Sequence, residues 1–156
     1  MEISLRPMRA DEFDTYLDHF IPDYAAEIST NYGLSPDEAR SKAIGAINED
    51  LAQGVDTKGQ ILMCVIRGAN VIGYLWYRSD QKAHSVFIND ICILAHYQGK
   101  GYGKQILGLF EAMVSDTGIE QIGLRVAADN DRAHHLYLKD GFQVTGINMI
   151  KRITKG

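Results

Sequence analysis

The sequence has few cysteines, no excess of positive charge and no long apolar run, and each shortage argues against a class of protein. Only Cys64 and Cys92 are present, both within apolar stretches, which favours a buried reduced pair over a disulfide framework. The net charge of −4 disfavours general nucleic-acid binding, which requires a basic face. No apolar run approaches the roughly 20 residues that span a bilayer, so no membrane partner is expected.

Signals for metal binding, export and multiple domains are also missing. No histidines and cysteines are grouped at metal-site spacing, so no metal is expected. The beginning of the chain, MEISLRPMRADEF, contains no hydrophobic signal region, which predicts a cytoplasmic location. The chain contains no repeat, low-complexity tract or linker. With 46% apolar and 23% charged residues, it is predicted to form a single globular domain over residues 1–156.

The spacing of apolar residues predicts alternating strands and helices. The expected strands are Glu2–Arg6, Gln60–Arg67, Val71–Arg78, Val86–Leu94, Glu120–Val126 and Phe142–Ile153. The expected helices are Ala10–Asn31, broken or bent at Pro22, then Ser35–Gln53, Gly101–Asp116 and Asn130–Lys139. The order βααβββαβαβ, with a mostly antiparallel front half, predicts an α/β fold: a mixed sheet with helices on both faces.

A glycine-rich turn lies between an apolar run and a helical pattern, and it has the features of an anion site. Glycines let the backbone approach a ligand closely, and free N–H groups at a helix start attract negative charge. Neither the Walker spacing nor the dinucleotide-binding spacing fits this turn. We interpret it as a phosphate-binding loop, and a tight turn with two solvated lysines is the alternative. Its residues are Gln98, Gly99, Lys100, Gly101, Tyr102, Gly103 and Lys104.

The spacing of Gln98, Gly101 and Gly103 resembles the acyl-CoA pyrophosphate loop of the GNAT superfamily of N-acetyltransferases. A second segment, with Asn130, Ala133 and Tyr137 followed by Gly141-Phe142, resembles the other signature of that superfamily. Two signatures in the right order are far more specific than either alone. One departure is Ala95-His96-Tyr97, where the family often has a proline between strand and loop.

The resemblance implies a GNAT-like fold whose sheet splays open at the strand before the loop, and an acetyl-CoA cosubstrate without a metal. The pantetheine arm would lie along backbone groups of that strand, with oxyanion donors near Ile93. Asn130 would bond this arm, and Ala133 would leave room for it. The implied cofactor-binding residues are Ile91, Cys92, Ile93, Leu94, Gln98, Gly99, Lys100, Gly101, Tyr102, Gly103, Lys104, Asn130, Ala133 and Tyr137.

Acetyl transfer to an amine requires a base for the amine and a donor for the departing thiolate. The resemblance makes Tyr137 the general acid, and a core tyrosine is the alternative. Asp90 interrupts an apolar strand, where partial burial would raise its pKa toward that of a useful base. An Asp that merely accepts hydrogen bonds is an equal alternative, and His84 and Glu27 are further base candidates. An acyl-carrier role for Cys92 is disfavoured because no adjacent histidine is evident.

Together these patterns predict an acetyl-CoA-dependent N-acetyltransferase. The acetyl group would pass directly to a primary amine, on a small molecule or a peptide, within a ternary complex. The net charge of −4 suits a cationic amine. The alternative function is a non-catalytic acyl-CoA-binding sensor or partner-binding module, which would need no acid near the sulfur. The identity of the acceptor stays open, as does assembly into a homodimer.

Overall fold

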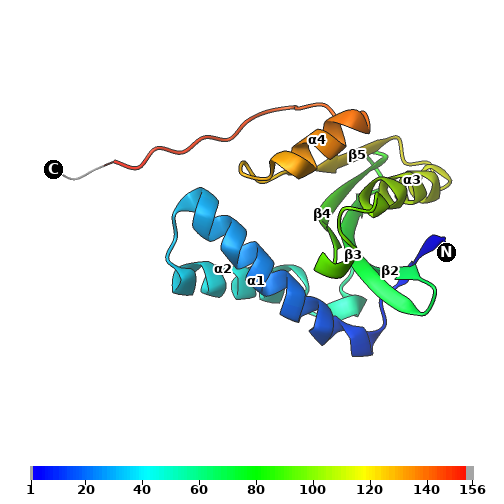
Figure 1. The fold of residues 1–156 in the computed structure, drawn as a ribbon, viewed down its shortest axis with the longest axis horizontal. Coiled ribbons are helices and arrows are strands. Elements are labelled where there is room, and N and C mark those ends of the chain that lie inside the picture. Colours follow the sequence, from blue (N-terminus) through cyan, green and yellow to red (C-terminus); the bar gives the residue numbers. More distant parts are fainter. Residues whose placement is uncertain (1, 154–156) are drawn as a thin grey trace.

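The computed structural model describes residues 2–153, and its centre is a mixed sheet in which neighbouring strands follow the order of the chain. The strands are β1 (Ile3–Pro7), β2 (Gln60–Arg67), β3 (Asn70–Asp80), β4 (Ser85–Ile93) and β5 (Gln121–Leu124). The first four pair antiparallel, whereas β4 and β5 pair parallel. A parallel pair needs a crossover connection, and the helix between β4 and β5 provides it (Figure 1).

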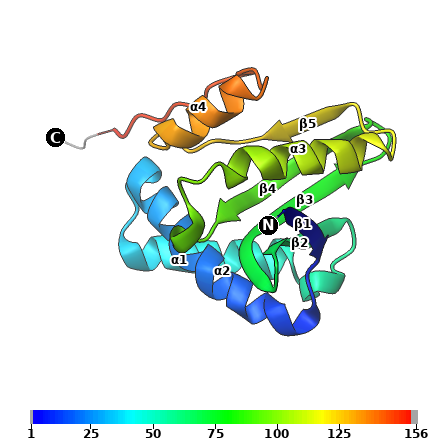
Figure 2. The same cartoon turned by 45° about the vertical axis from the view of Figure 1, so that its right-hand side comes forward.

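Helices cover both faces of the sheet, as Figure 2 shows. The helices α1 (Phe13–Tyr32) and α2 (Pro36–Asp50) pack against one face through a cluster that includes Phe20, Ile47 and Trp76. The helix α3 (Tyr102–Ser115) covers the other face through Leu107 and Phe110, and α4 (Asp131–Lys139) contributes partly buried residues to that cluster. The predicted α/β fold class, with helices on both faces, is therefore confirmed.

The first long helix is continuous through Pro22, so of the two predicted alternatives, a broken or a bent helix, the broken one is wrong. A short 3-10 turn, Ala10–Glu12, precedes it, and Gly33 ends it in a left-handed conformation. Proline removes one backbone donor from a helix, but packing of the apolar face holds the remaining turns together. Phe20 and Ile28, buried on either side of Pro22, provide that packing.

The strands β4 and β5 separate halfway along their length. Residues 85–88 of β4 pair with Gln121–Leu124, but residues 89–93 have no strand on that side within residues 2–153. Backbone groups on this part of β4 are consequently available to a ligand. Gln98 already uses one of them, because its side-chain nitrogen donates to the Ile93 carbonyl at 2.8 Å. This is the splayed sheet that the family resemblance implied.

A bulge in β4 determines which face of the sheet its side chains occupy after the point where β4 and β5 separate. Trp76 pairs with Asp90 whereas Tyr77 pairs with Ile88, so Asn89 is an extra residue in β4. One extra residue moves every later side chain to the opposite face of the sheet. Ile88 packs on the α3 side, and Asp90 two residues later reaches the α1 side.

The last predicted strand, Phe142–Ile153, is wrong for the described structure. Residues 142–153 have no regular secondary structure, and most of their side chains are exposed. Figure 1 shows this segment passing α4 and leaving the body of the molecule. A strand forms only where a neighbouring strand completes its hydrogen bonds, and alternation of residue types cannot supply that neighbour. None of the helices in residues 2–153 combines the length and apolarity that a membrane span requires.

Candidate functional site

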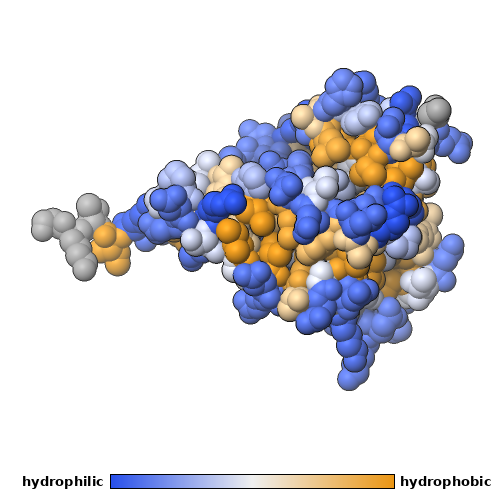
Figure 3. Space-filling view, turned by 90° about the horizontal axis from the view of Figure 1, so that it is seen from below, coloured by the Kyte–Doolittle hydropathy of each residue, from blue (hydrophilic) through white to orange (hydrophobic). Residues whose placement is uncertain are grey.

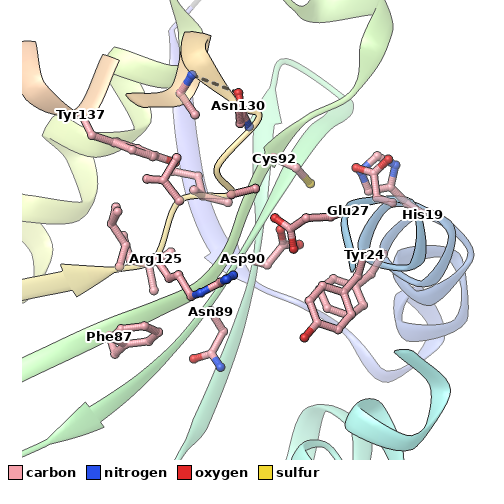
Figure 4. Close-up of a pocket in the computed structure, with 18 residues that line it drawn as sticks. His19, Tyr24, Glu27, Phe87, Asn89, Asp90, Cys92, Arg125, Asn130 and Tyr137 are labelled. Atoms are coloured by element: carbon pink, nitrogen blue, oxygen red, sulfur yellow. Dashed lines mark hydrogen bonds and ion pairs between the residues drawn. The ribbon is translucent and has the colours of Figure 1, made fainter. Parts of the chain in front are cut away.

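A cavity of about 320 Å³ lies where β4 and β5 separate. Its walls come from α1, from the second half of β4, from the segment after β5 and from α4. Figure 4 shows Glu27, Asp90 and Tyr137 approaching this space from α1, β4 and α4 respectively. Three elements that are distant in sequence thus bring polar side chains into one concave site, which is the usual form of a small-molecule site.

Asp90 is held by a hydrogen bond from the first helix. The Tyr16 hydroxyl donates to the Asp90 carboxylate at 2.7 Å, and the Tyr16 side chain is fully buried. Tyr16 itself is packed against Tyr74, with ring centroids 5.0 Å apart. A packed donor of this kind fixes the orientation of the carboxylate and leaves its second oxygen free of this bond.

Burial raises the pKa of Asp90 to about 7, because a carboxylate out of water loses solvation. The negative charges of Asp23 and Glu27 raise this pKa further, while the bond from Tyr16 lowers it. Burial also raises the pKa of Glu27. A carboxyl group with a pKa close to neutrality, open to a cavity, is suited to exchanging protons with a ligand.

One face of α4 lines the same cavity. Asn130, Ala133 and Tyr137 all border it, as their three- and four-residue spacing predicted. The Asn130 side chain caps α4 by accepting from the Ala133 backbone N–H at 3.1 Å. Burial, with a contribution from the charge of Asp90, raises the pKa of Tyr137 to about 12. Tyr137 therefore stays protonated, and remains a hydrogen-bond donor, throughout the neutral range.

The glycine loop lies between the end of β4 and α3, and two of its glycines have left-handed backbone conformations. Gly99 and Gly101 have φ angles of 78° and 82°, a region that side-chain-bearing residues rarely adopt. Nothing lies within 4 Å of the position that a Cβ would take on Gly101, so ligand can approach there. Gly103 serves packing instead, since a Cβ there would lie 3.1 Å from the Leu136 side chain.

Positive charge surrounds the loop. Lys100 and Lys104 are exposed on it, as the sequence predicted. Arg132 of α4 adds a third cation, with a guanidinium nitrogen 3.6 Å from the position of a Cβ on Gly99. Tyr102 at the start of α3 instead packs beneath Arg67, whose guanidinium carbon is 5.9 Å from the ring centroid. The loop and its cations can bind an anion through backbone N–H groups and charge together.

The remaining predicted site residues separate into cavity and core. Cys92 and Ile91 border the cavity, and Ile93 packs toward α3 while Leu94 packs toward α1. Burial raises the pKa of the Cys92 thiol, which disfavours a nucleophilic thiolate. His84 lies in the loop before β4 and does not border the cavity.

Comparison with known families identifies this arrangement. The profile of the Acetyltransferase (GNAT) family matches residues 16–142, which is most of the chain. The chain belongs to this acetyltransferase family. GNAT relatives extend along nearly the full length: the Bacillus subtilis N-acetyltransferase YycN, itself uncharacterised, is 30% identical over 156 residues and covers 98% of this chain and 100% of that protein. The B. subtilis N-acetyltransferase YdgE is 24% identical over 156 residues, 98% of this chain and 99% of its own.

Solved GNAT structures share the fold. The crystal structure of B. subtilis YycN superposes with a TM-score of 0.92 at 29% identity, covering 99% of this chain and 100% of that one. The PaiA N-acetyltransferase of Thermoplasma acidophilum, solved with coenzyme A, gives a TM-score of 0.74 at 16% identity, over 95% and 94% of the two chains. The Vibrio cholerae spermidine N-acetyltransferase, solved with CoA and spermine, gives 0.69 at 19% identity, over 99% and 88%.

Sequence reasoning missed Tyr16 and Arg132. Tyr16 lies 74 residues from Asp90, and within its helix it follows the same apolar spacing as the core aromatics. No local signal separates such a tyrosine from its neighbours. Arg132 could have been found, because it lies within the second signature segment. The glycine at position 103 is a second signal, since it lets α4 pack close to the loop through Leu136.

Proposed function

We propose that this protein is an acetyl-CoA-dependent N-acetyltransferase that transfers the acetyl group directly to a primary amine. One observation carries the proposal: a single cavity at the β4–β5 separation is lined by a carboxyl group on β4 whose pKa is about 7 and by a protonated tyrosine on α4. These are the two proton-handling groups that the reaction requires. Membership of the GNAT family supports the same reaction class.

The residues around the glycine loop fit the phosphates of acetyl-CoA. Backbone N–H groups from Gly99 to Lys104 would bind the phosphates, with open space beside Gly101, and the three nearby cations would offset negative charge. The pantetheine arm would pair with the free edge of residues 91–94, and Asn130 and Ala133 would border it. When bound, the cosubstrate supplies an activated acetyl thioester. Backbone N–H groups near Ile93 would stabilise negative charge on the thioester oxygen.

Asp90 would act as the base for the acceptor. An alkyl amine is protonated at neutral pH and must lose a proton before it attacks. Asp90 has a pKa of about 7, so above that pH its carboxylate can accept this proton, directly or through water. Tyr16 would hold the carboxylate in position. The hydroxyl of Tyr137 would donate to the thiolate that leaves from the other side.

The acidic lining of the cavity favours a cationic acceptor. Asp23 and Glu27 lie one helical turn apart on α1 and border the same cavity as Asp90. Their negative charges attract an ammonium group and disfavour a carboxylate-bearing amine. The V. cholerae enzyme named above was solved with spermine, a polyamine, although its likeness to this chain extends to the fold alone.

Thiol release from acetyl-CoA tests the proposal directly. Purified protein is mixed with acetyl-CoA and one member of a panel of monoamines, diamines, polyamines or peptides with free N-termini. We expect thiol release that depends on a cationic amine. Double-reciprocal plots of the initial rate, made at several fixed concentrations of the second substrate, should give intersecting lines, because both substrates bind before the reaction. Parallel lines would instead indicate an acyl-enzyme. Tight CoA binding without release across the panel would favour the alternative, a non-catalytic acyl-CoA sensor.

A further inference from the structure

Two hydrogen bonds join the end of α1 to the segment between β5 and α4, which form different walls of the cavity. The guanidinium of Arg125 donates to the Tyr32 hydroxyl at 2.7 Å, and the Asn31 side-chain amide donates to the Asp129 carboxylate at 2.9 Å. These contacts link residues that are 93 and 98 positions apart in the sequence. Both views of the fold show the two segments side by side (Figures 1 and 2). We term these four residues the clasp.

The clasp extends two surfaces that line the cavity. On α1, Asp23 and Glu27 border the cavity, and Asn31 lies one turn farther along the same helix face. The Asn31 amide also donates to the Glu27 backbone carbonyl at 2.9 Å, which ties the clasp to a cavity residue. On the other wall, Arg125 itself borders the cavity, and Figure 4 shows it entering from the side opposite Glu27. The clasp thus joins the acidic wall of α1 to the wall formed by β5 and α4.

Apolar packing does not hold these two walls together. The cluster that fixes α1 on the sheet includes members of this helix between Phe13 and Tyr24, so the last two turns of α1 lie outside it. β5 and α4 pack into the cluster on the opposite face of the sheet. Residues 143–153 touch the end of α1 through Arg152, which lies against Gly33, but they project from the body as a narrow extension and bury no core residue (Figure 3). Both clasp bonds are exposed, and water competes with exposed hydrogen bonds, so the walls can part.

We propose that the clasp closes the cavity over a bound amine, which makes its four members positioning residues for the acceptor. This inference rests on the proposed function, since it assigns the acidic wall of α1 to an ammonium group. Closure holds Asp23 and Glu27 against that group, and opening lets the acceptor enter and the product leave. The predicted cofactor-binding residues lie on β4, the glycine loop, α3 and α4, and none lies on α1, so CoA binding does not depend on the clasp.

The charges around the clasp agree with this role. Burial raises the pKa of Glu27, and the positive charge of Arg125 opposes that shift. Arg125 thereby helps Glu27 to keep the negative charge that attracts an ammonium group. The Tyr32 hydroxyl holds the guanidinium on its own wall, and the carboxyl groups of Asp23, Glu27 and Asp90 outnumber it in the cavity. A cationic acceptor therefore meets an acidic wall even with the clasp closed.

Closure also keeps bulk water from the acetyl thioester. In an open cavity, water can take the place of the amine. A C–O bond then forms at the carbonyl carbon, the C–S bond breaks, one water proton goes to the sulfur and the other to solvent. The products are acetate and the free thiol of CoA. A weakened clasp should consequently increase thiol release in the absence of any amine.

Steady-state kinetics of the full chain compare a double variant with a matched control. Tyr32→Phe/Asp129→Ala removes one partner from each clasp bond and keeps the ring of Tyr32. Thr30→Ala/Asp131→Ala removes a hydroxyl and a carboxylate two residues away from those positions, where both side chains are exposed. The acceptor is the amine of the thiol-release panel that gives the highest rate. Melting curves check that both variants fold.

We expect the clasp variant to raise KM for the amine on the order of tenfold, as the loss of two weak hydrogen bonds would give. Amine-independent thiol release should rise several-fold, and the dissociation constant of CoA should stay near the parent value. The control should match the parent in all three measurements. Tyr32→Phe/Asp129→Asn keeps an oxygen acceptor for Asn31 and should recover part of the lost amine affinity.

Hydrogen–deuterium exchange reads the clasp without any turnover. Amides in residues 28–32 and 125–130 should exchange faster in the clasp variant than in the control. A parent that releases thiol with no amine would contradict the proposed function, and exchange would still decide whether the clasp holds the walls. Unchanged exchange, or an unchanged amine KM in an active and folded clasp variant, would overturn the clasp. An equal rise in the CoA dissociation constant would overturn it as well, because a general distortion of the site would then explain both effects.

Discussion

At the scale of single residues, the burial of the Asp90 carboxylate lowers the stability of the fold, and the surrounding groups only partly offset this loss. Its carboxylate loses solvation on burial, and Asp23 and Glu27 add like charge nearby. The hydrogen bond from Tyr16 is the main compensation. A residue that weakens the fold in its ionised form, yet lies open to a cavity, is typical of a site kept for function at some expense of stability.

This cost predicts a pH dependence of stability. The pKa of Asp90 is near 4 in an unfolded chain and about 7 in the folded one, so folding takes up a proton between those values. The contribution of Asp90 is present in full below pH 4 and is lost as pH rises through about 7. Asp90→Asn removes this dependence. Relative to the parent, the variant should gain on the order of 2 kcal/mol in free energy of unfolding between pH 5 and pH 8.

Urea denaturation of parent and variant at several pH values measures this difference. Asp14→Asn, on the exposed first turn of α1, is a matched control that should show no comparable gain. Equal pH profiles for parent and Asp90→Asn would show that the pKa of Asp90 is not raised by folding.

The hydroxyl group of Tyr137 can be tested by removing it alone. Tyr137→Phe keeps the ring that packs on Phe142 at 5.5 Å and removes only the hydroxyl donor. If Tyr137 protonates or hydrogen-bonds the departing thiolate, kcat should fall on the order of 10²-fold with little change in acetyl-CoA affinity. The measurement is kcat under conditions where chemistry limits the rate, alongside the dissociation constant of CoA.

Tyr77→Phe is the control for this variant. Tyr77 is buried against Phe110 on the α3 face and does not border the cavity, so losing its hydroxyl should leave kcat near the parent value. Near-normal turnover in Tyr137→Phe would remove Tyr137 from the catalytic residues and leave protonation of the thiolate to solvent.

At the scale of elements, the junction of β4, the glycine loop and α3 concentrates the features on which the proposed cosubstrate site depends. The bulge at Asn89 turns Asp90 toward the cavity, and the separation from β5 frees backbone groups just after it. The glycine loop begins at Gln98, five residues after the end of β4. A break in sheet regularity therefore produces both the proposed base and the proposed binding edge, and bulges are common near active sites.

The loop itself carries a prediction on binding. Gly101→Val places a branched side chain at a φ of 82° and into the open space where phosphates would lie. We expect the dissociation constant of CoA to rise by at least tenfold. Gly108→Val, in the middle of α3 with nothing within 4 Å of its Cβ position, is the matched control and should bind CoA like the parent.

Isothermal titration calorimetry with CoA makes the comparison, and melting curves check that both variants fold. Unchanged CoA affinity in a folded Gly101→Val protein would show that the phosphates bind somewhere other than this loop.

At the scale of the whole molecule, one sheet lies between two apolar clusters, and this arrangement predicts how the chain unfolds. Strands β2 and β3 contribute side chains to both clusters, through Leu62 and Trp76 on one face and Met63 and Leu75 on the other. Neither cluster can lose its sheet without exposing the other. We therefore predict a single cooperative thermal transition, as expected of one domain.

Binding of CoA should raise the midpoint temperature of this single unfolding transition without splitting it in two. Binding to the folded state alone stabilises by RT ln(1 + [L]/Kd), or about 2.7 kcal/mol at a CoA concentration of 100 Kd. For a chain of this size, such a gain corresponds to a rise of roughly 5–10 °C in Tm. Differential scanning calorimetry with and without CoA tests this, and two transitions with only one responding would contradict the single-domain prediction.

The sequence by itself determined the repeating local structure and the family. Apolar periodicity predicted all the strands and helices up to α4, because alternation and helical spacing reflect which side chains face a core. The glycine loop and the α4 signature were readable for a related reason: each is a short segment whose backbone geometry dictates its residues. Ser35 at the start of α2 is a further case, since its hydroxyl accepts from the Glu38 N–H as the sequence predicted.

Only the tertiary structure decided how distant segments meet. Tyr16 became the partner of Asp90 because packing brings α1 over the bulge in β4, and nothing in either segment encodes that contact. Pro22 was absorbed into one helix because burial of the surrounding turns outweighs a missing hydrogen bond. Residues 143–153 look like a strand in sequence but have no strand neighbour in the described chain, because pairing depends on a second segment that local sequence does not specify.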